Sequence, residues 1–339
     1  MILELHKMTK REDICAVIGY GSWATAIVKI LTENGLRVNW HVLNEDVAES
    51  VRCDGRNCKY LRDVDLETSL INVMSDINEV VAQAQSVILA MPSAFAKKVL
   101  EPLHVSLEDK IVISAVKGIV PDEYLPLTDY MTMRYGVPQS RISLITGPSH
   151  AEEVGLHRLS YLTAVCRDKD VRRRVVEMFS RPYIVVSESE ELDGVEYASI
   201  MKNIYAIAVG MAVGLGYGDN FVAVLISNCA AEMSRFFASF GSAKHRVLAS
   251  ASLGDLLVTC YSNYSRNRRF GLLIGRGCTV KSAMNEMTMV AEGYYAAKCI
   301  RYTSLDKQLE LPIADMVYNV LYNNASARRA MRELSKRLI

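Results

Sequence analysis

The sequence has 339 residues, half of them hydrophobic, and a formal net charge of +1. This length allows two domains with cores of their own, and the composition is that of an ordinary globular protein. A chain so close to neutral is not expected to bind nucleic acid in general by its charge. Residues 1–13 begin with a short apolar run followed by charges and contain no cleavable hydrophobic region. We therefore interpret them as a leader to the first strand and not as a signal peptide.

The eight cysteines are scattered and form no C-x-x-C pair, and the six histidines show no metal-ligand spacing. Cys53 and Cys58 lack the second pair that a zinc site needs. We expect no metal site, reduced thiols and a cytoplasmic location.

The first half of the chain alternates between short apolar runs and helical patterns, which predicts a doubly wound, mostly parallel sheet. Expected strands cover residues 14–18, 37–43, 86–90, 110–114, 143–146, 161–165 and 184–186. Ligands of such sheets bind beyond the carboxyl ends of the strands. Lys117 and the run Gly147-Pro148-Ser149 follow two of these ends. For Lys117 a solvated loop lysine is the alternative interpretation.

The first strand leads directly into Gly19-Tyr20-Gly21-Ser22-Trp23-Ala24, and a helix is expected from Thr25 to Asn34, capped by Gly35. Strand, G-x-G-x-x-A, helix and strand in this order form the context of a dinucleotide fingerprint. Gly19 permits the tight turn, Gly21 lets the backbone approach a pyrophosphate, and Ala24 lets helix and strand pack closely. A glycine-rich structural turn is the alternative, and the context favours cofactor binding.

Strand patterns end near the acidic stretch 187–193, and helical periodicity follows. We predict a dinucleotide-binding domain over residues 1–190 and an all-helical substrate and catalytic domain over residues 191–339. Within the latter, residues 197–220 predict a helix buried nearly all round, interrupted too often by glycine to cross a bilayer. Lys202 lies inside it, so its ammonium must find a partner, shift its pKa or face a polar cleft. The alternative is that Lys202 reaches from the helix end into solvent.

Residues 259–269 contain three arginines, two asparagines and several hydroxyl groups. This stretch could be a solvated basic loop, but arginine forks match phosphate oxygens and Ser and Asn add further donors. We favour a phosphate site.

These motifs follow one another in an order that resembles a known family. They are Gly19–Ala26, Lys117-Gly118, Gly147–Glu152, Lys202-Asn203, Gly218–Asn220, Gly254–Leu256, Ser265–Asn267 and Glu292-Gly293. Over nearly its whole length the chain resembles the bacterial NAD(P)-dependent glycerol-3-phosphate dehydrogenases. The resemblance implies reversible reduction of dihydroxyacetone phosphate to sn-glycerol 3-phosphate, which feeds phospholipid synthesis.

The resemblance also implies roles for individual residues. Lys202 matches the catalytic proton donor and acceptor, Lys117 a second active-site lysine, and Asp255 the acid that orients the substrate and Lys202. The implied substrate and phosphate contacts are Lys117, Gly147, Ser149, Lys202, Asp255, Ser265, Arg266 and Asn267. The implied cofactor contacts beyond the fingerprint glycines and Ala24 are Ser22, Trp23, Lys117, Ala151, Arg266, Val290 and Glu292.

The end of the second expected strand departs from the family pattern. Many relatives carry an arginine or histidine there that can face a 2′-phosphate, whereas this chain has Leu43 followed by Asn44-Glu45-Asp46. Among NAD(H) and NADP(H) we therefore favour NAD(H).

Two other functions remain open from the sequence. One is a related beta-hydroxyacid dehydrogenase that acts on phosphogluconate or ketopantoate, and the other is a catalytically silent NAD-binding sensor or scaffold. We expect a small-molecule substrate, no nucleic acid and no transmembrane segment, and the sequence leaves a homodimer open.

Overall fold

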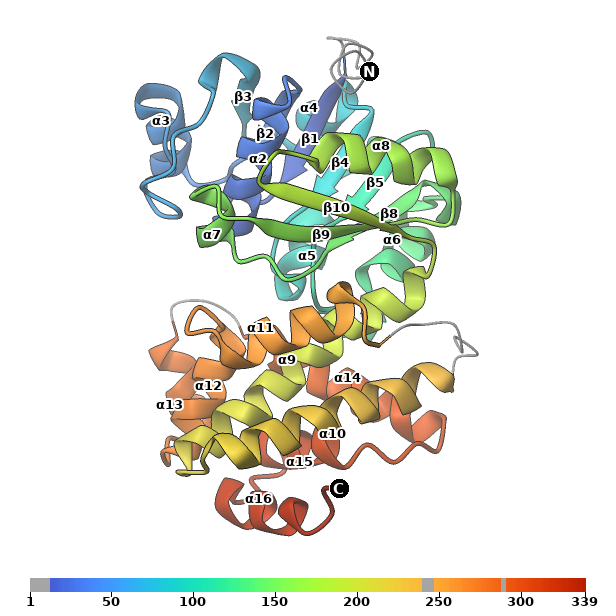
Figure 1. Cartoon of the computed structure of the whole chain (residues 1–339). Coiled ribbons are helices and arrows are strands. Elements are labelled where there is room, and N and C mark those ends of the chain that lie inside the picture. The colour runs from blue at the N-terminus through green and yellow to red at the C-terminus, as the bar shows by residue number, and fades with distance from the viewer. Residues whose placement is uncertain (1–12, 240–246, 288–290) are drawn as a thin grey trace. The chain divides into compact units, whose positions relative to one another are not determined.

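The computed structural model describes residues 13–239, 247–287 and 291–339 (Figure 1). The chain divides into two compact units. The sheet unit contains the residues up to Met91 together with Phe95–Val116 and Leu127–Leu192. The helical unit contains Pro92–Ala94, Lys117–Pro126 and Asp193–Ile339, so two short segments of the first half belong to it. The assignment of function to residues 1–190 and 191–339 remains a prediction.

The sheet unit is built on one eight-stranded sheet in the order β10-β9-β8-β5-β4-β1-β2-β3. Its strands are β1 (Ile14–Ile18), β2 (Arg37–His41), β3 (Ile71–Met74), β4 (Ser86–Leu89), β5 (Ile111–Ser114), β8 (Ile142–Thr146), β9 (Ser160–Val165) and β10 (Ile184–Ser189). Neighbours are parallel except β8 and β9, which are antiparallel. The predicted doubly wound, mostly parallel sheet is confirmed.

Helices connect these strands and cover both faces of the sheet, as right-handed crossovers require (Figure 1). They are α2 (Ser22–Glu33), α3 (Glu45–Asp54), α4 (Ile77–Ala82), α5 (Ser93–Leu100), α6 (Leu127–Tyr135), α7 (Ala151–Gly155) and α8 (Lys169–Phe179), with 3₁₀ turns η1 (Thr68–Leu70) and η2 (Gln139–Arg141). The core beneath them includes the fully buried Trp40, Ile27, Ile88 and Phe179.

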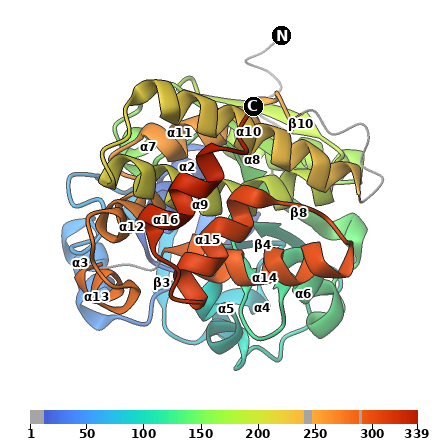
Figure 2. The same cartoon turned by 90° about the horizontal axis from the view of Figure 1, so that it is seen from below.

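Apart from a two-stranded ribbon, the helical unit is all α, as predicted (Figure 2). Its elements are β6 (Ile119–Val120), β7 (Leu125–Pro126), α9 (Leu192–Gly214), α10 (Asp219–Ala238), a π-helical turn η3 (Ser250–Gly254), α11 (Asp255–Tyr261), α12 (Arg266–Gly275), α13 (Val280–Glu286), α14 (Glu292–Asp306), α15 (Pro312–Tyr322) and α16 (Ala327–Ser335).

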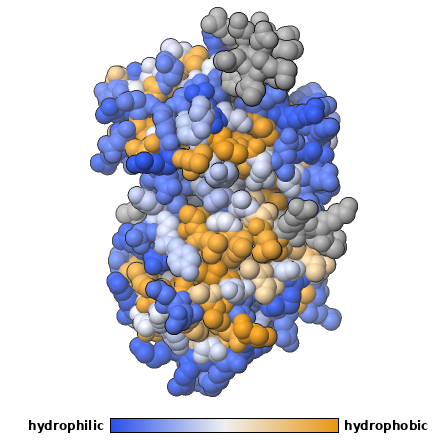
Figure 3. All heavy atoms as spheres, in the orientation of Figure 1, coloured by the Kyte–Doolittle hydropathy of each residue, from blue (hydrophilic) through white to orange (hydrophobic). Residues whose placement is uncertain are grey.

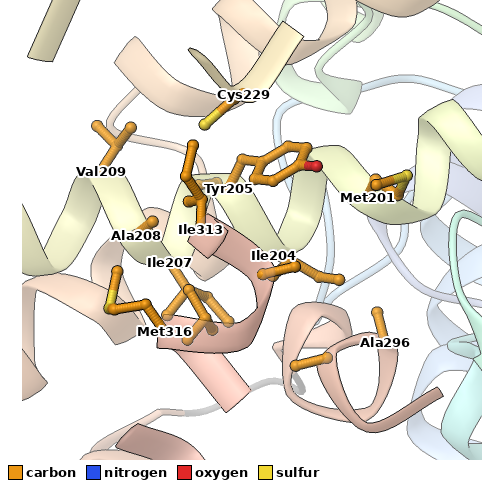
Figure 4. Packing of buried hydrophobic residues seen from close by; sticks show 14 of the residues in the cluster. Met201, Ile204, Tyr205, Ile207, Ala208, Val209, Cys229, Ala296, Ile313 and Met316 are labelled. Carbon is orange, nitrogen blue, oxygen red and sulfur yellow. The ribbon is translucent and has the colours of Figure 1, made fainter. Parts of the chain in front are cut away.

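Helix α9 runs through the middle of this unit and is the buried helix that the sequence predicts. Every residue from Ala198 to Ala212 is buried. Figure 4 shows how Ile204 and Ile207 lie among side chains of the surrounding helices, such as Met316 and Ala296. A helix enclosed on all sides holds its side chains in fixed rotamers, because the interior is close-packed.

Several local predictions were wrong at their boundaries. Helix α2 begins at Ser22 and not at Thr25, because the chain enters the helix directly from Gly21, which is the N-cap. The arginine-rich stretch is not a loop throughout, since α12 already begins at Arg266. Strand β3 was missed because its four residues include the polar Asn72 and show no clear alternation.

Among the described residues, α10 is the one helix long and apolar enough by length and composition to cross a membrane. The core helix of a soluble protein meets the same criterion, and α10 contributes Leu225, Cys229 and Phe236 to the core of its unit. Apolar side chains are also visible on the surface of this unit (Figure 3). Its exposed large apolar residues include Val224 and Leu257. Scattered exposed apolar residues are common on soluble proteins and identify no partner by themselves.

Candidate functional site

The turn between β1 and α2 is shaped by backbone geometry and not by charged side chains. Gly19 has a φ of +116°, and a side-chain carbon there would lie 2.5 Å from the carbonyl oxygen of Ala90, so only glycine fits. The Trp40 indole N–H donates to the Gly19 carbonyl oxygen over 2.7 Å and holds the turn in place. This anchoring keeps the turn rigid.

The turn fits the pyrophosphate of a dinucleotide. No side chain caps α2 at Gly21, and its first turn carries no acid, so its first N–H groups and the positive end of the helix dipole suit an anion. Nothing lies within 4 Å of the point where a side chain at Gly21 would begin, so the backbone there can be approached closely. The Trp23 indole nitrogen is buried and has no hydrogen-bond partner among the described residues.

A cation that the sequence analysis missed lies beyond the end of β2. The Lys59 ammonium donates to Asn44 Oδ1 over 3.0 Å and pairs with Asp46 over 2.7 Å. This contact raises the pKa of Lys59 and lowers that of Asp46, although both are exposed. Lys59 stands fifteen residues after Asn44 in the chain. No local pattern therefore pointed to it.

The second predicted loop of the sheet unit follows β8. Gly147 has a φ of +134°, and a side-chain carbon there would lie 2.6 Å from the Tyr161 carbonyl oxygen. The Ser149 hydroxyl donates to the Gly147 carbonyl oxygen over 3.1 Å, and α7 begins at Ala151. The structure thus places Gly147, Ser149 and Ala151 in one tight turn after a strand end.

In the helical unit, the three residues predicted to be catalytic lie together. Lys202 on α9 contacts Asp255, the first residue of α11, and the Lys117 ammonium lies 3.3 Å from the other carboxylate oxygen of Asp255. Lys202 and Asp255 are 4% and 1% exposed, while Lys117 is partly exposed. The alternative of a Lys202 directed into solvent is therefore wrong, whereas Lys117 lies in a loop, partly exposed, and is paired with Asp255.

The burial of this cluster changes the acidity of Lys202. Burial lowers the pKa of Lys202 to about 7, the Asp255 carboxylate opposes the shift, and the second ammonium of Lys117 adds to it. A lysine with a pKa near neutrality exists in both protonation states at physiological pH. It can therefore give or take a proton.

A chain of amide hydrogen bonds links this cluster to two further helices. The Asn203 side chain donates to the Lys117 carbonyl oxygen over 2.7 Å. Asn267 donates to Asn203 Oδ1 over 2.9 Å and accepts from the Gly293 backbone N–H over 2.9 Å. The two asparagine side chains and the Gly293 N–H group are buried, so the network holds α9, α12, α14 and the Lys117 segment in one arrangement.

Glycines allow the close approach of α9 and α12 on which this network depends. A side-chain carbon at Gly214 would lie 2.5 Å from the Leu272 carbonyl oxygen, and one at Gly271 would clash with the Ile207 carbonyl group. Both helices therefore need glycine where their backbones touch. The glycines that interrupt the apolar run of α9 are explained by this contact.

The start of α12 combines arginine with a helix N-terminus. Ser265 caps the helix by accepting from the Arg268 N–H over 3.2 Å, and Arg266 and Asn267 are its first two residues. A helix N-terminus favours anions, and an arginine beside it adds a bidentate donor. The arrangement is well suited to a phosphate group.

Glu292 begins α14, and both of its carboxylate oxygens bind Ser93. The Ser93 N–H donates to Oε1 over 2.8 Å and the Ser93 hydroxyl donates to Oε2. Burial raises the pKa of the Glu292 carboxyl group, while the two bonds from Ser93 and the nearby Arg266 oppose the shift. Val290, predicted to contact the cofactor, lies outside the described residues.

Comparison with known proteins identifies the family of the chain. The family described as NAD-dependent glycerol-3-phosphate dehydrogenase matches residues 14–172 with its N-terminal part and residues 191–332 with its C-terminal part. The chain belongs to this family.

Individual relatives cover nearly the whole chain. A glycerol-3-phosphate dehydrogenase (NAD(P)+) of Halothermothrix orenii is 34% identical over 96% of this chain and 95% of its own length. One of Staphylococcus aureus is 32% identical over 95% of this chain and 97% of its own length. The crystal structure of the Coxiella burnetii glycerol-3-phosphate dehydrogenase aligns with a TM-score of 0.87 at 27% identity, over 96% of this chain and 99% of that one.

Not every buried ionisable group of this dehydrogenase belongs to the site. Glu232 on α10 accepts from the N–H groups of Ile313 and Ala314, over 2.5 and 3.3 Å, and so caps α15. Burial raises the pKa of Glu232 to about 7. Because it binds the first N–H groups of α15 and none of the described residues predicted for the site, we assign it a structural role. Among the described residues no cluster of three or more His, Cys, Asp or Glu could hold a metal ion.

Ser93 and the linking role of Asn203 were not predicted from the sequence. Ser93 follows Pro92, just beyond the end of a predicted strand, and a polar residue at a strand end was the one feature of the sequence that could have indicated it. Asn203 was noted as part of a motif but was given no role. Its function in the network depends on an α12 residue 64 positions away.

Proposed function

We propose that the chain catalyses the reversible reduction of dihydroxyacetone phosphate to sn-glycerol 3-phosphate, with Lys202 as the acid and base. The buried cluster of Lys202, Asp255 and Lys117 carries the proposal. Family membership and the dinucleotide fingerprint at Gly19–Ala24 support it.

In the reduction, negative charge develops on the carbonyl oxygen of the substrate as hydride arrives at the carbonyl carbon. When bound, the reduced nicotinamide supplies that hydride. The Lys202 ammonium stabilises the developing charge and delivers its proton to the oxygen. Asp255 orients the ammonium, and Lys117 adds positive charge beside it.

In the oxidation, neutral Lys202 takes the proton from the substrate hydroxyl group. An unperturbed lysine would be almost fully protonated near neutrality, whereas a pKa of about 7 leaves a large neutral fraction. Burial and Lys117 therefore make the reverse reaction accessible.

The substrate phosphate is proposed to bind at the start of α12, to Ser265, Arg266 and the helix N–H groups. The Asn267 side chain already bonds Asn203 and Gly293, so we assign it mainly to holding the site together. Gly147 and Ser149 are proposed as further substrate contacts. Binding energy from the remote phosphate can then orient the reacting carbonyl group.

For the cofactor, we propose contacts from Gly19, Gly21, Ser22, Trp23, Ala24 and Ala151, and from Lys117, Arg266, Val290 and Glu292. Lys59 supplies a cation near the end of β2, but Asp46 neutralises it. We therefore keep the preference for NAD(H) over NADP(H). Supply of glycerol 3-phosphate for phospholipid synthesis, in the cytoplasm, is proposed as the cellular role.

The test is oxidation of NADH and NADPH by the purified protein with dihydroxyacetone phosphate, followed at 340 nm. Unphosphorylated dihydroxyacetone serves as the control for the phosphate site, and ketopantoate and phosphogluconate represent the related dehydrogenases. We expect turnover of dihydroxyacetone phosphate far above that of the other substrates. NADH binding without turnover of any substrate would instead identify a silent NAD-binding protein.

A further inference from the structure

Ser93 lies in the short segment Pro92–Ala94, where the chain leaves the sheet unit after β4 and joins the helical unit. It is fully buried, and its hydroxyl and N–H groups both donate to the Glu292 carboxylate. Two hydrogen bonds to one ionised group are strong in a buried setting. This pair therefore holds the segment firmly against the start of α14.

The backbone of Gly118 lies directly against this pair. A side-chain carbon at Gly118 would clash with both the Ser93 hydroxyl and the Glu292 carboxylate. The position of the chain at Gly118 is thus defined by Ser93 and Glu292 on one side. Lys117 is the residue before it.

Lys117 is held from two other directions. Its carbonyl oxygen accepts from Asn203 over 2.7 Å, and its ammonium lies 3.3 Å from Asp255. A lysine side chain has many rotamers, so the direction of its ammonium depends on how firmly its own backbone is fixed. The contact at Gly118 and the bond from Asn203 therefore both fix the backbone that carries the Lys117 side chain.

We propose that Ser93 is a positioning residue of the dehydrogenase reaction, which by holding Glu292 against Gly118 directs Lys117 toward Asp255. The proposal rests on the proposed function of Lys117. A purely structural contact between two segments would not affect the reaction in a specific way. The proposal instead predicts that Ser93 affects the reaction by positioning Lys117.

Three variants and their controls test it. Ser93→Ala removes the hydroxyl group and keeps the backbone. Glu292→Gln keeps two hydrogen-bonding atoms in nearly the same shape and serves as the conservative replacement. Ser304→Ala is the matched control, since Ser304 is a buried serine on α14 whose hydroxyl donates to a backbone oxygen, about 18 Å along the helix from Glu292.

The first readout does not depend on activity. Hydrogen exchange of the backbone, measured by mass spectrometry on a peptide covering residues 115–126, should be faster in Ser93→Ala than in the unmodified protein. Glu292→Gln should change it less, and Ser304→Ala should leave it unchanged. Unchanged exchange in Ser93→Ala would overturn the proposal.

The second readout is a double-mutant cycle in the reduction of dihydroxyacetone phosphate. Ser93→Ala should lower kcat about tenfold with little change in KM, since it misplaces a charge and not the phosphate. In a Lys117→Ala background the same change should alter kcat by less than about twofold. Equal effects in both backgrounds would mean that Ser93 does not act through Lys117.

The two readouts separate this proposal from the proposed function. An unmodified protein that reduces no dihydroxyacetone phosphate refutes the proposed function, while exchange at residues 115–126 still decides whether Ser93 holds the Lys117 segment. Thermal unfolding of each variant identifies a global loss of fold. If Ser93→Ala does not fold, hydrogen exchange at residues 115–126 in Glu292→Gln decides: exchange faster than in the unmodified protein supports the proposal, and unchanged exchange overturns it.

Discussion

The fingerprint turn of the sheet unit and the charged cluster of the helical unit are built in opposite ways. The turn takes its properties from backbone N–H groups and glycine geometry within six consecutive residues. The cluster takes them from side chains of Lys117, Lys202 and Asp255, which are up to 138 positions apart. The turn therefore depends on φ values that only glycine adopts readily, as at Gly19, whereas the cluster is expected to depend on each of its charged side chains and on the packing that brings them together.

The largest effect is expected from Lys202→Ala in the cluster. Loss of the proposed acid, which would also stabilise the developing charge, should lower kcat by three or more orders of magnitude, roughly 4 kcal/mol of transition-state stabilisation. Steady-state kinetics in both directions measure it, with circular dichroism as the check on folding. Near-normal kcat would remove Lys202 from the chemistry.

Arg266→Ala should have the next largest effect, because it removes the proposed phosphate donor beside the helix N-terminus. We expect kcat/KM for dihydroxyacetone phosphate to fall about a hundredfold, with KM raised and kcat lowered. Arg269→Ala, an exposed arginine on the same helix, is the matched control. A change in thermal stability alone would show that Arg266 is structural.

The fingerprint turn is tested by Gly19→Ala. The added carbon meets the Ala90 carbonyl oxygen at 2.5 Å and strains a φ of +116°, so the turn must move. We expect NADH binding, measured by fluorescence titration, to weaken at least tenfold, together with a loss of stability of about 1–3 kcal/mol. Gly35→Ala, in open space at the end of α2, controls for glycine replacement at positive φ. Equal NADH affinity in both variants would contradict the proposed role of the turn.

The pH dependence of kcat in the two directions tests the proposed role of the cluster. If Lys202 is the acid and base as proposed, reduction should fall as pH rises through about 7, and oxidation should rise over the same range. Lys117→Ala removes the ammonium that lowers the pKa of Lys202, so both profiles should move to higher pH. Profiles of kcat that do not move would show that Lys117 acts on the substrate alone.

The smallest effect is expected from Asp46→Asn, which frees the Lys59 cation near the end of β2. The ratio of kcat/KM for NADPH to that for NADH should rise several-fold, because an unpaired ammonium can attract the 2′-phosphate. Glu45→Gln, which removes a neighbouring acid that pairs with Arg52, is the control. A strong preference of the unmodified protein for NADPH would overturn the proposed use of NADH.

Much of the molecule was predictable from the sequence because its signals are local. Short apolar runs separated by helical patterns indicate a parallel sheet, and a G-x-G-x-x-A turn between strand and helix indicates a dinucleotide site. The buried helix around Lys202 was evident from its apolar residues on every face. The motifs in their order were sufficient to indicate the family.

What the sequence could not supply depends on contacts between distant segments. Whether Lys202 points into solvent or meets Asp255 was decided by the packing of α9 against α11 and α12, which glycine contacts allow. The pKa of Lys202, the Lys59 cation and the Ser93–Glu292 pair likewise arise from residues that no local pattern connects. Periodicity reports which face of a segment is buried, but only the folded chain determines which charged groups are buried together.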